Sequence, residues 1–410
     1  MEVKKSKIHK RDIFYMMLFI PFFEPSYIGH NISPLHMLFR LAAYASIFII
    51  GIIYLSSVIN HIRKISRPVI FIVIYSCILL FSTILNGGLV STVIIEGVTL
   101  ISLFMLSDII LQRSVKEYIS VLYPIFYVLV VVNFITMLLY PDGMYKYVMD
   151  GSYYWASNNN WFLGYENALI VFLLPTLVYA YISNMIKGTR LTQFNCILIT
   201  IICIYTPIVR WKASTIVCFF FFFLMCILSI LKLAPNIFNA WTYLIFNVVM
   251  FLILVIIGVQ GGILAFVVEN VLRKGDTLGV RTVIWGKAIE LISQKPVLGY
   301  GYEATRVITD KLKYDSTHNQ YLWILYRGGM AQFGAFAWII YSISNRLYKK
   351  REHLVVKVVA ITFCVIMVMW QTEAITAYAV MTFLVFAYYV PEDQDFLQRL
   401  RTYRFMRKRA

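Results

Sequence analysis

Charged residues are scarce in this chain, and acidic residues are scarcer than basic ones. Asp, Glu, Lys and Arg make up 14% of the 410 residues, hydrophobic residues make up 60%, and the mean hydropathy is +0.75. Globular domains in water carry about 25% charged residues, and a soluble chain this apolar lacks the polar side chains to cover its surface. The composition therefore excludes a set of soluble domains and predicts that most of the chain lies in a bilayer.

Features that would indicate metal or disulfide chemistry are also missing. The 6 cysteines all lie within apolar runs and none has metal-ligand spacing, which predicts packing roles. The single Asp-x-Asp pattern, Asp393 to Asp395, directly follows Pro391, and we expect it to cap a helix. The other acids expected on the outer side are scattered. We therefore predict a site that uses no metal and no other cofactor.

The chain instead contains a series of apolar runs long enough to cross a bilayer. At about 20 residues per span there is room for about twelve spans, so we predict an all-α, polytopic membrane protein with residues 1–410 in one domain. The predicted spans are 13–28, 35–59, 68–85, 89–111, 118–140, 161–182, 191–208, 214–231, 241–259, 318–343, 354–370 and 374–390. The first run resembles a signal peptide but lacks a small-x-small cleavage site, and we expect a retained span.

The excess of cations predicts the orientation. Lys and Arg number 37 against 20 Asp and Glu, a net charge of +17. In a membrane chain such an excess marks cytoplasmic loops, and it does not indicate nucleic acid as a partner. The connections after even-numbered spans are basic and share a side with the basic N-terminus, as does the basic tail 391–410. Both termini are therefore predicted to be cytoplasmic.

Some cations break this pattern. The predicted outer loop 260–317, between spans nine and ten, carries eight Lys and Arg residues, and a short outer turn adds Arg210 and Lys212. Long loops can translocate regardless of charge, so simple solvation is one explanation. The other is an external site for a polyanion.

The outer loop contains a predicted helix that starts near Arg281. Apolar residues recur there at helical spacing, at Ile284, Trp285, Ala288, Ile289 and Ile292. We expect this helix to lie on the membrane surface, with Arg281 and Trp285 one turn apart, and to stop before Pro296. The following Pro296-Val-Leu-Gly-Tyr-Gly301 predicts a turn, whose glycines can let backbone approach a ligand.

A polar segment directly precedes the tenth predicted span. Thr317 and Gln320 have capping-box spacing, which makes Thr317 the expected N-cap and places His318 at the first helical position. The positive end of a helix disfavours an imidazolium, so we expect a neutral imidazole able to accept a proton. A histidine that merely sits at a polar interface is the alternative.

Together these motifs resemble the signature of the O-antigen ligase and polymerase family, which are bacterial membrane glycosyltransferases. The matching elements are Arg281-x-x-x-Trp285, Pro296-x-x-Gly-x-Gly301, His318-Asn319-x-Tyr321-Leu322 and Arg327-Gly-Gly. The resemblance extends to Arg210 at the end of the seventh span, although Val209 and Trp211 flank it where many relatives have Ser and Gly.

The resemblance implies a chemistry and a set of partners. The donor would be a glycan on undecaprenyl diphosphate, and the acceptor a sugar hydroxyl of another lipid-linked repeat. Arginine suits a departing diphosphate because its charge is permanent and its fork matches phosphate oxygens, and His318 would act as base. The residues expected to bind the diphosphate are Arg210 and Arg281, with Lys212, Lys287 and Arg306 as further candidates. Trp285, Asn319 and Tyr321 are expected to bind substrate because they belong to the signature.

Other side chains are candidates for the same site. Arg327 lies nine residues past His318 (327 − 318), about 13 Å along a helix, and either lines the same cavity lower down or makes a structural ion pair. Like Arg40 and Glu96, it falls within or near the end of an apolar run, where a charge is costly unless it faces the protein interior. Aromatic residues of the outer loops can stack on sugars, namely Tyr153, Trp155, Tyr300 and Tyr302.

The resemblance implies a polysaccharide polymerase that acts on the extracytoplasmic side of the bacterial inner membrane by inverting transfer, because Gly-Val-Arg281-Thr-Val-Ile-Trp285 and His318-Asn-Gln-Tyr-Leu322 look closer to polysaccharide polymerases. A ligase that moves a finished glycan to lipid A-core or protein is the alternative, because it uses the same donor. A transporter or flippase also fits about twelve spans, but the two halves of the chain do not resemble each other. A chain-length regulator and a flippase are the protein partners that a polymerase implies.

Overall fold

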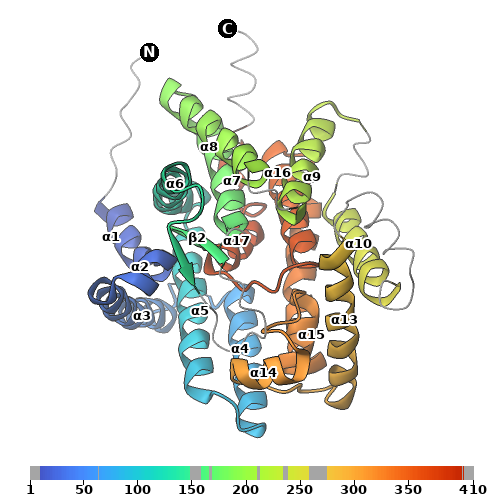
Figure 1. The fold of residues 1–410 in the computed structure, drawn as a ribbon. Helices are drawn as coiled ribbons and strands as arrows, with labels where there is room; N and C mark the ends of the chain where they lie inside the picture. The colour runs from blue at the N-terminus through green and yellow to red at the C-terminus, as the bar shows by residue number, and fades with distance from the viewer. Residues whose placement is uncertain are drawn as a thin grey trace.

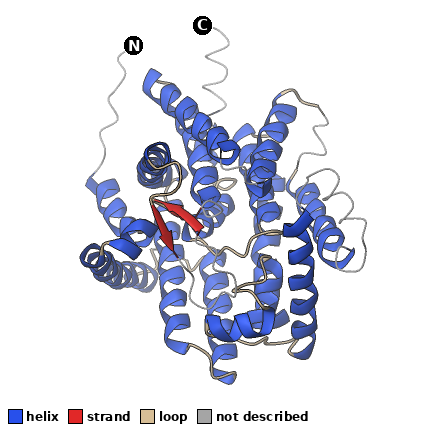
Figure 2. Ribbon diagram, in the orientation of Figure 1, coloured by secondary structure: helices blue, strands red, loops and turns tan. Residues whose placement is uncertain are grey.

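The structure is a computed structural model, and it describes residues 10–62, 64–147, 158–165, 169–209, 213–233, 239–257, 275–398 and 400. Most of the described chain is helical (Figures 1 and 2). The first half contains α1 (Lys10–Phe19), η1 (Ile20–Phe23), α2 (Ser26–Asn31), α3 (Ser33–Ile59), α4 (Arg67–Leu85), α5 (Val90–Leu111), α6 (Val115–Leu139), β1 (Tyr145–Tyr147), β2 (Asn158–Trp161), β3 (Gly164–Tyr165), α7 (Ile170–Lys187) and α8 (Arg190–Val209). The second half contains α9 (Ala213–Ile230), α10 (Ala240–Phe251), η3 (Leu252–Ile257), α13 (Gly275–Gln294), α14 (Thr305–Leu312), α15 (Gln320–Lys349), α16 (Leu354–Met369) and α17 (Tyr378–Tyr389).

The predicted all-α membrane architecture is confirmed in its main feature. Among the described residues, the helices α3 to α8 are each long and apolar enough to cross a membrane, and four shorter apolar helices follow in α9, α10, α16 and α17. The bounds of α3 to α6, α8, α9 and α16 agree with the predicted spans to within three residues. α7 starts and ends later than predicted, α10 gives way to η3 after Phe251, and α17 starts four residues late (378 − 374). A total of about twelve spans stays a prediction.

The connections predicted to be basic gather at one end of the bundle, which we call the basic end. The side-chain amide of Gln112, after α5, donates to the Lys64 carbonyl before α4 at 3.2 Å. The backbone amide of Val115, in α6, donates to the Asp393 carboxylate after α17 at 3.0 Å. Asp393 also accepts from the amide of Phe396 at 2.9 Å, which confirms the predicted capping role. The α7–α8 turn and the end of α9 lie at the same end (Figure 1).

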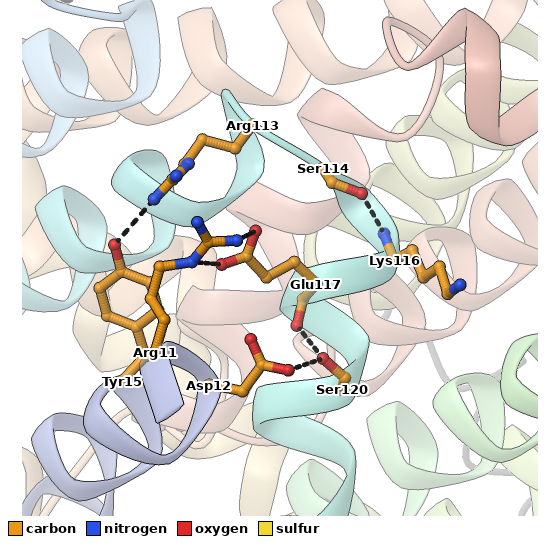
Figure 3. A network of polar contacts seen from close by, with 8 residues as sticks. All are labelled: Arg11, Asp12, Tyr15, Arg113, Ser114, Lys116, Glu117 and Ser120. Carbon is orange, nitrogen blue, oxygen red and sulfur yellow. Dashed lines mark hydrogen bonds and ion pairs between the residues drawn. The ribbon is translucent and has the colours of Figure 1, made fainter. Parts of the chain in front are cut away.

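The predicted first span, 13–28, is wrong as a single helix. It is divided into α1, the 3-10 turn η1 and α2, because Pro21 and Pro25 remove backbone donors and interrupt the helix. α1 is clamped onto α6 by a bidentate Arg11–Glu117 pair, with distances of 2.7 and 2.9 Å (Figure 3). The segment therefore packs as a broken helix along the side of the bundle.

A small sheet precedes α7 where the sequence predicted only a loop and the start of a span. β2 pairs antiparallel with β1 and with β3, with Tyr145 opposite Asn160 and Trp161 opposite Gly164 (Figure 2). Trp161 is fully buried, and its indole donates to the Tyr140 carbonyl at 2.8 Å. The predicted span 161–182 therefore begins late, at Ile170.

The predicted tenth span, 318–343, is wrong because α15 doubles back on itself. The rings of Tyr321 and Phe336 lie 6.2 Å apart, whereas fifteen residues (336 − 321) of straight helix would separate them by about 22 Å. The reversal occurs at Gly329, whose φ of +61° and ψ of −163° are not helical. A short arm, 320–328, thus runs antiparallel to a long arm, 330–349.

The connection between α16 and α17, residues 370–377, ends deep inside the molecule. α17 has 12 residues and α4 has 19, so α17 rises about 18 Å from the basic end and α4 about 28 Å. Tyr378 accordingly lies beside Thr99, nine residues (99 − 90) into α5, and both line one cavity. The connection is recessed by about 10 Å from the far end of the bundle, the end that carries the turn at Asn86.

The helix predicted for the outer loop is present as α13, and it ends before Pro296 as expected. Its predicted position on the membrane surface is wrong. Trp285 and Ala288 are buried in a cluster with Leu322, Trp323 and Tyr326 of the short arm of α15, and α13 stands beside α15 (Figure 1). The apolar face of α13 finds this protein partner only because α15 folds back.

Candidate active site

An ion pair joins α13 to the recessed connection 370–377. Arg281 Nη2 lies 3.0 Å from Glu373 Oε1, and the two side chains are 21% and 9% exposed. A partly buried guanidinium beside one carboxylate keeps most of its five donors for other acceptors. Arg281 is thus fixed in place and still able to bind an anion.

His318 lies directly before the short arm, in a conformation that L-residues seldom adopt. Its φ is +46°, in the left-handed region, at a cost of about 1–2 kcal/mol. The expected cap is wrong: Asn319 is the N-cap, and its Oδ1 accepts from the amides of Tyr321 and Leu322 at 3.0 and 3.1 Å. Thr317 instead donates its hydroxyl to the Asn319 carbonyl at 2.8 Å. His318 therefore precedes the helix instead of opening it.

Hydrogen bonds from buried side chains hold this strained segment in place. The Trp285 indole donates to the Thr317 carbonyl at 3.0 Å, and Trp285 is fully buried. Asn319 Nδ2 donates to the Gln371 carbonyl at 2.9 Å, and the Gln320 amide donates to the Trp370 carbonyl at 2.8 Å. The segment 317–320, α13 and the recessed connection are thereby locked together, so that Arg281, His318 and Glu373 belong to one site.

The surroundings of His318 favour its neutral form. Burial lowers the pKa of His318 below the usual value of about 6.5, Asp315 opposes that shift, and the positive charge of Arg281 adds to it. His318 Nε2 lies 4.0 Å from Asp315 Oδ1, and the imidazole is 31% exposed. A neutral, accessible imidazole at pH 7 can accept a proton.

The small sheet contributes Tyr165 to the same region. Burial raises the pKa of its phenol, Glu373 raises it further, and Arg281 lowers it, so the tyrosine lies within electrostatic range of both members of the ion pair. A phenol at this place can donate to a substrate oxygen. No sequence motif indicated Tyr165.

A second polar cluster surrounds Arg327. Its guanidinium lies over the rings of Tyr302 and Trp323, at 3.9 and 4.3 Å from their centroids, and the Tyr302 hydroxyl donates to Glu96 at 2.8 Å. The Arg327 Nε is buried and has no hydrogen-bond partner. The predicted alternative of a direct ion pair is not what these contacts show: Arg327 is held by aromatic faces.

This cluster lines a cavity of about 340 Å³ that adjoins the recessed connection. Its walls are formed by Glu96, Leu100, Trp323, Arg327, Ala374, Thr376, Ala377 and Tyr378. The expectation that Arg327 lies lower down is wrong, because the short arm runs outward from His318. The Arg327 carbonyl accepts from Gly301 at 2.7 Å, toward the far end of the bundle.

The glycine motifs prove to be structural. The loop after α13 crosses the break in α15, where the amides of Met330 and Ala331 donate to the carbonyls of Pro296 and Val297 at 2.8 and 3.1 Å. A Cβ on Gly299 would lie 2.5 Å from the Tyr326 carbonyl oxygen. The glycines are therefore approached by the backbone of the broken helix α15 and not by a ligand. The Pro-x-x-Gly-x-Gly and Arg-Gly-Gly motifs pack against each other at the break in α15, and we call this contact the joint.

The structure does not bring all predicted residues together. Lys287 is half-buried, six positions past Arg281 and thus about 120° away around the axis of α13. Arg306 is exposed on α14, which crosses the far end of the bundle (Figure 1). Tyr321 donates to the Met367 carbonyl at 3.0 Å, and Tyr300 stacks on Tyr326. The remaining predicted residues, Arg210, Lys212, Tyr153 and Trp155, lie outside the described residues.

Glu373 is the residue that the sequence analysis missed. It lies in a short polar break, Gln371-Thr-Glu373, between two apolar runs, and such an acid is a functional candidate by its position alone. In the described part of the chain, no three His, Cys, Asp or Glu side chains come together. A metal-independent reaction stays a prediction.

The described residues thus form a helical membrane protein in which a guanidinium, an imidazole and a carboxylate meet at a recessed connection. Residues 175–339, from α7 to the long arm of α15, match the family described as O-Antigen ligase. This match confirms the resemblance to the O-antigen ligase and polymerase family, and it indicates a glycosyltransferase-type activity of the ligase or polymerase kind. The matched region contains Arg281, His318 and Arg327, whereas Glu373 lies outside it. No curated protein sequence matches the chain.

Proposed function

We propose that the protein is a polysaccharide polymerase that joins oligosaccharide repeats carried on undecaprenyl diphosphate, on the extracytoplasmic side of the bacterial inner membrane. The observation that carries the proposal is the cluster of Arg281, His318 and Glu373 in a recessed site. Two of the three, Arg281 and His318, lie in the region that matches the O-antigen ligase family. The reaction needs charge stabilisation for a diphosphate and a base for a hydroxyl, and this cluster holds both.

In the proposed reaction an acceptor sugar hydroxyl attacks the anomeric carbon of the donor. The new carbon–oxygen bond forms as the bond to the diphosphate oxygen breaks, with inversion at that carbon. His318 takes the hydroxyl proton, and the departing diphosphate gains the electron pair and is stabilised by Arg281. Arg210 and Lys212 are proposed as further ligands of the diphosphate. Glu373 fixes the direction of the Arg281 fork.

The cavity beside Arg327 is proposed to hold the acceptor sugar. Its wall offers the Trp323 and Tyr378 rings for stacking and Glu96 and Thr376 as polar partners. An acceptor held there would lie beside the connection that carries Glu373. Trp285 and Asn319 are buried and engaged in hydrogen bonds, so we propose that they position His318 instead of touching substrate.

The test uses purified protein and lipid-linked repeat units as the only substrate. A ladder of products longer than one repeat is the expected result. The second candidate is a ligase, which the description of the matched family favours. An absolute requirement for a chemically different acceptor, such as lipid A-core or a protein, would establish ligation and contradict polymerisation.

The substitution His318→Ala distinguishes a transferase from a transporter. Loss of polymer with outward-facing lipid-linked repeats is expected for a transferase. Accumulation of repeats on the cytoplasmic leaflet would instead show that the protein transports them, and it would overturn the proposal.

A further inference from the structure

The basic end of the bundle contains a cavity that the proposed reaction does not use. Its volume is about 660 Å³, and it lies between the connection 60–66, the last turns of the long arm of α15 and the end of α17. It is at the opposite end of the molecule from the turn at Asn86. We call it the basic-end cavity.

Positive charge in this cavity is largely unneutralised. Lys64, Arg67, Arg346 and Lys349 line it, and the acid on its rim is Glu392, which lies 3.0 Å from Arg346. Within the described part of the chain, Lys64, Arg67 and Lys349 make no ion pair, and all three are exposed. Three free cations converging on one cavity form a site for an anion.

One polar group of the wall suits phosphate oxygens, the side-chain amide of Asn345. The two serines of the wall are engaged elsewhere: Ser342 donates to the Trp338 carbonyl at 2.7 Å, and Ser66 bonds to Asp108. Arg346 also lies over the ring of Tyr388, at 3.6 Å from its centroid, which fixes its guanidinium. An acid lies behind this wall: Asp108 is fully buried, and it accepts from Tyr389, Gln112 and Tyr54 at 2.5, 2.8 and 3.2 Å. These donors screen it from the cavity.

The sides of the cavity are apolar and exposed. Ile62, Ile65 and Tyr341 line it and are 73%, 52% and 52% exposed. Further exposed apolar residues continue away from the basic end along α3, α4 and α15, among them Ile59, Ile70 and Trp338. A free anion would need none of this surface, whereas the acyl chains of a lipid would cover it.

We propose that the basic-end cavity binds the phosphate of an anionic phospholipid, with the acyl chains along the apolar sides of α3, α4 and α15. Basic pockets between membrane helices favour anionic headgroups because each nearby cation contributes to the attraction. The inference does not depend on which reaction the protein catalyses. It assigns a lipid partner of defined chemistry to the end remote from His318.

The experiment measures binding to the full-length, delipidated protein in detergent. Native mass spectrometry and a fluorescent phosphatidylglycerol supply the affinities, with phosphatidylcholine and inorganic phosphate as competitors. The test variant replaces Lys64, Arg67 and Lys349 by Gln. The matched control replaces Lys116, Lys187 and Arg190 by Gln, since these exposed cations lie at the same end but outside the cavity.

Phosphatidylglycerol is expected to bind the unaltered protein, and the test variant to bind it about 100-fold more weakly, at roughly a fivefold loss per cation. The control variant should change affinity less than about threefold, because charges outside the contact are screened. Equal losses in the two variants would show attraction by net charge alone and would overturn the proposal.

Inorganic phosphate that competes as well as the lipid would assign the cavity to a free anion, and phosphatidylcholine that binds equally would remove the role of charge. Either outcome contradicts an anionic lipid site. Should the triple variant unfold, Lys349→Glu alone is the second test. It is expected to weaken phosphatidylglycerol binding, and unchanged binding in this variant would also refute the site.

Discussion

The Arg281–Glu373 ion pair is the contact on which the proposed site depends most directly. Substituting Glu373→Gln keeps the length of the side chain and one acceptor oxygen, but it removes the charge that holds the guanidinium. Hydrogen bonds to charged groups contribute about 1.5–3 kcal/mol, and because Gln retains part of this bond we expect a loss of about 1.4 kcal/mol. If Arg281 then points away from the diphosphate, the same energy corresponds to about a tenfold lower kcat/KM.

The assay is the rate of polymer or ligated product formed by the purified protein, measured beside its thermal unfolding. The matched control is Glu117→Gln, which removes the carboxylate of another Arg–Glu pair, that of Arg11 (Figure 3). The two carboxylates have similar exposure, 9% for Glu373 and 11% for Glu117. The control should lose stability without losing activity per folded molecule.

Two results would refute the reasoning. Full activity of Glu373→Gln would show that the ion pair does not orient a functional arginine. An equal loss of activity in Glu117→Gln would show that the assay reports packing of the bundle, since that pair joins α1 to α6 at the basic end.

Three further predictions concern the strained segment and the joint. His318→Ala should lower activity by about 10²–10⁴-fold. Wild-type activity should be flat near pH 7 and fall in acid, because burial lowers the pKa of His318 below its usual value of about 6.5 and leaves the imidazole neutral at pH 7. The same shift makes folding stability fall as the pH drops below about 6.5, because the unfolded chain then binds more protons than the folded one. A pH series of activity and of thermal unfolding tests the two expectations, and a loss of activity or stability at alkaline instead of acidic pH would contradict them. Gly329→Ala should unfold the α15 hairpin, because a Cβ at this position would meet backbone atoms and the residue has a positive φ. The control Gly334→Ala places its Cβ in open space and should stabilise the helix by up to about 1 kcal/mol. Equal melting temperatures of the two variants would refute the hairpin. Trp285→Phe removes the hydrogen bond to Thr317 and should cost about 0.5–1.5 kcal/mol of stability. We expect kcat to fall by a larger factor than any rise in KM. A change in KM alone would indicate that Trp285 contacts the substrate directly.

The sequence by itself determined where the helices α3 to α6 run. α3 to α6 begin and end close to the predicted bounds because an apolar segment in lipid must satisfy its own backbone, and this requirement is local. The basic connections grouped correctly at one end for a related reason, since charge is excluded from the bilayer residue by residue. The motifs of the outer loop were likewise visible in the sequence, because their cations, glycines and histidine stand between apolar runs.

Only the tertiary structure decided how those motifs meet. Arg281 and Glu373 are separated by 92 residues, and no periodicity links them. Their meeting requires α15 to reverse at Gly329, a reversal that depends on contact with the loop after α13 and so is not encoded in the local hydrophobic pattern. The cap at Asn319 was mispredicted for the same reason: its amide is held by the carbonyl of Gln371, 52 residues away, so a long-range contact chose between two local capping patterns.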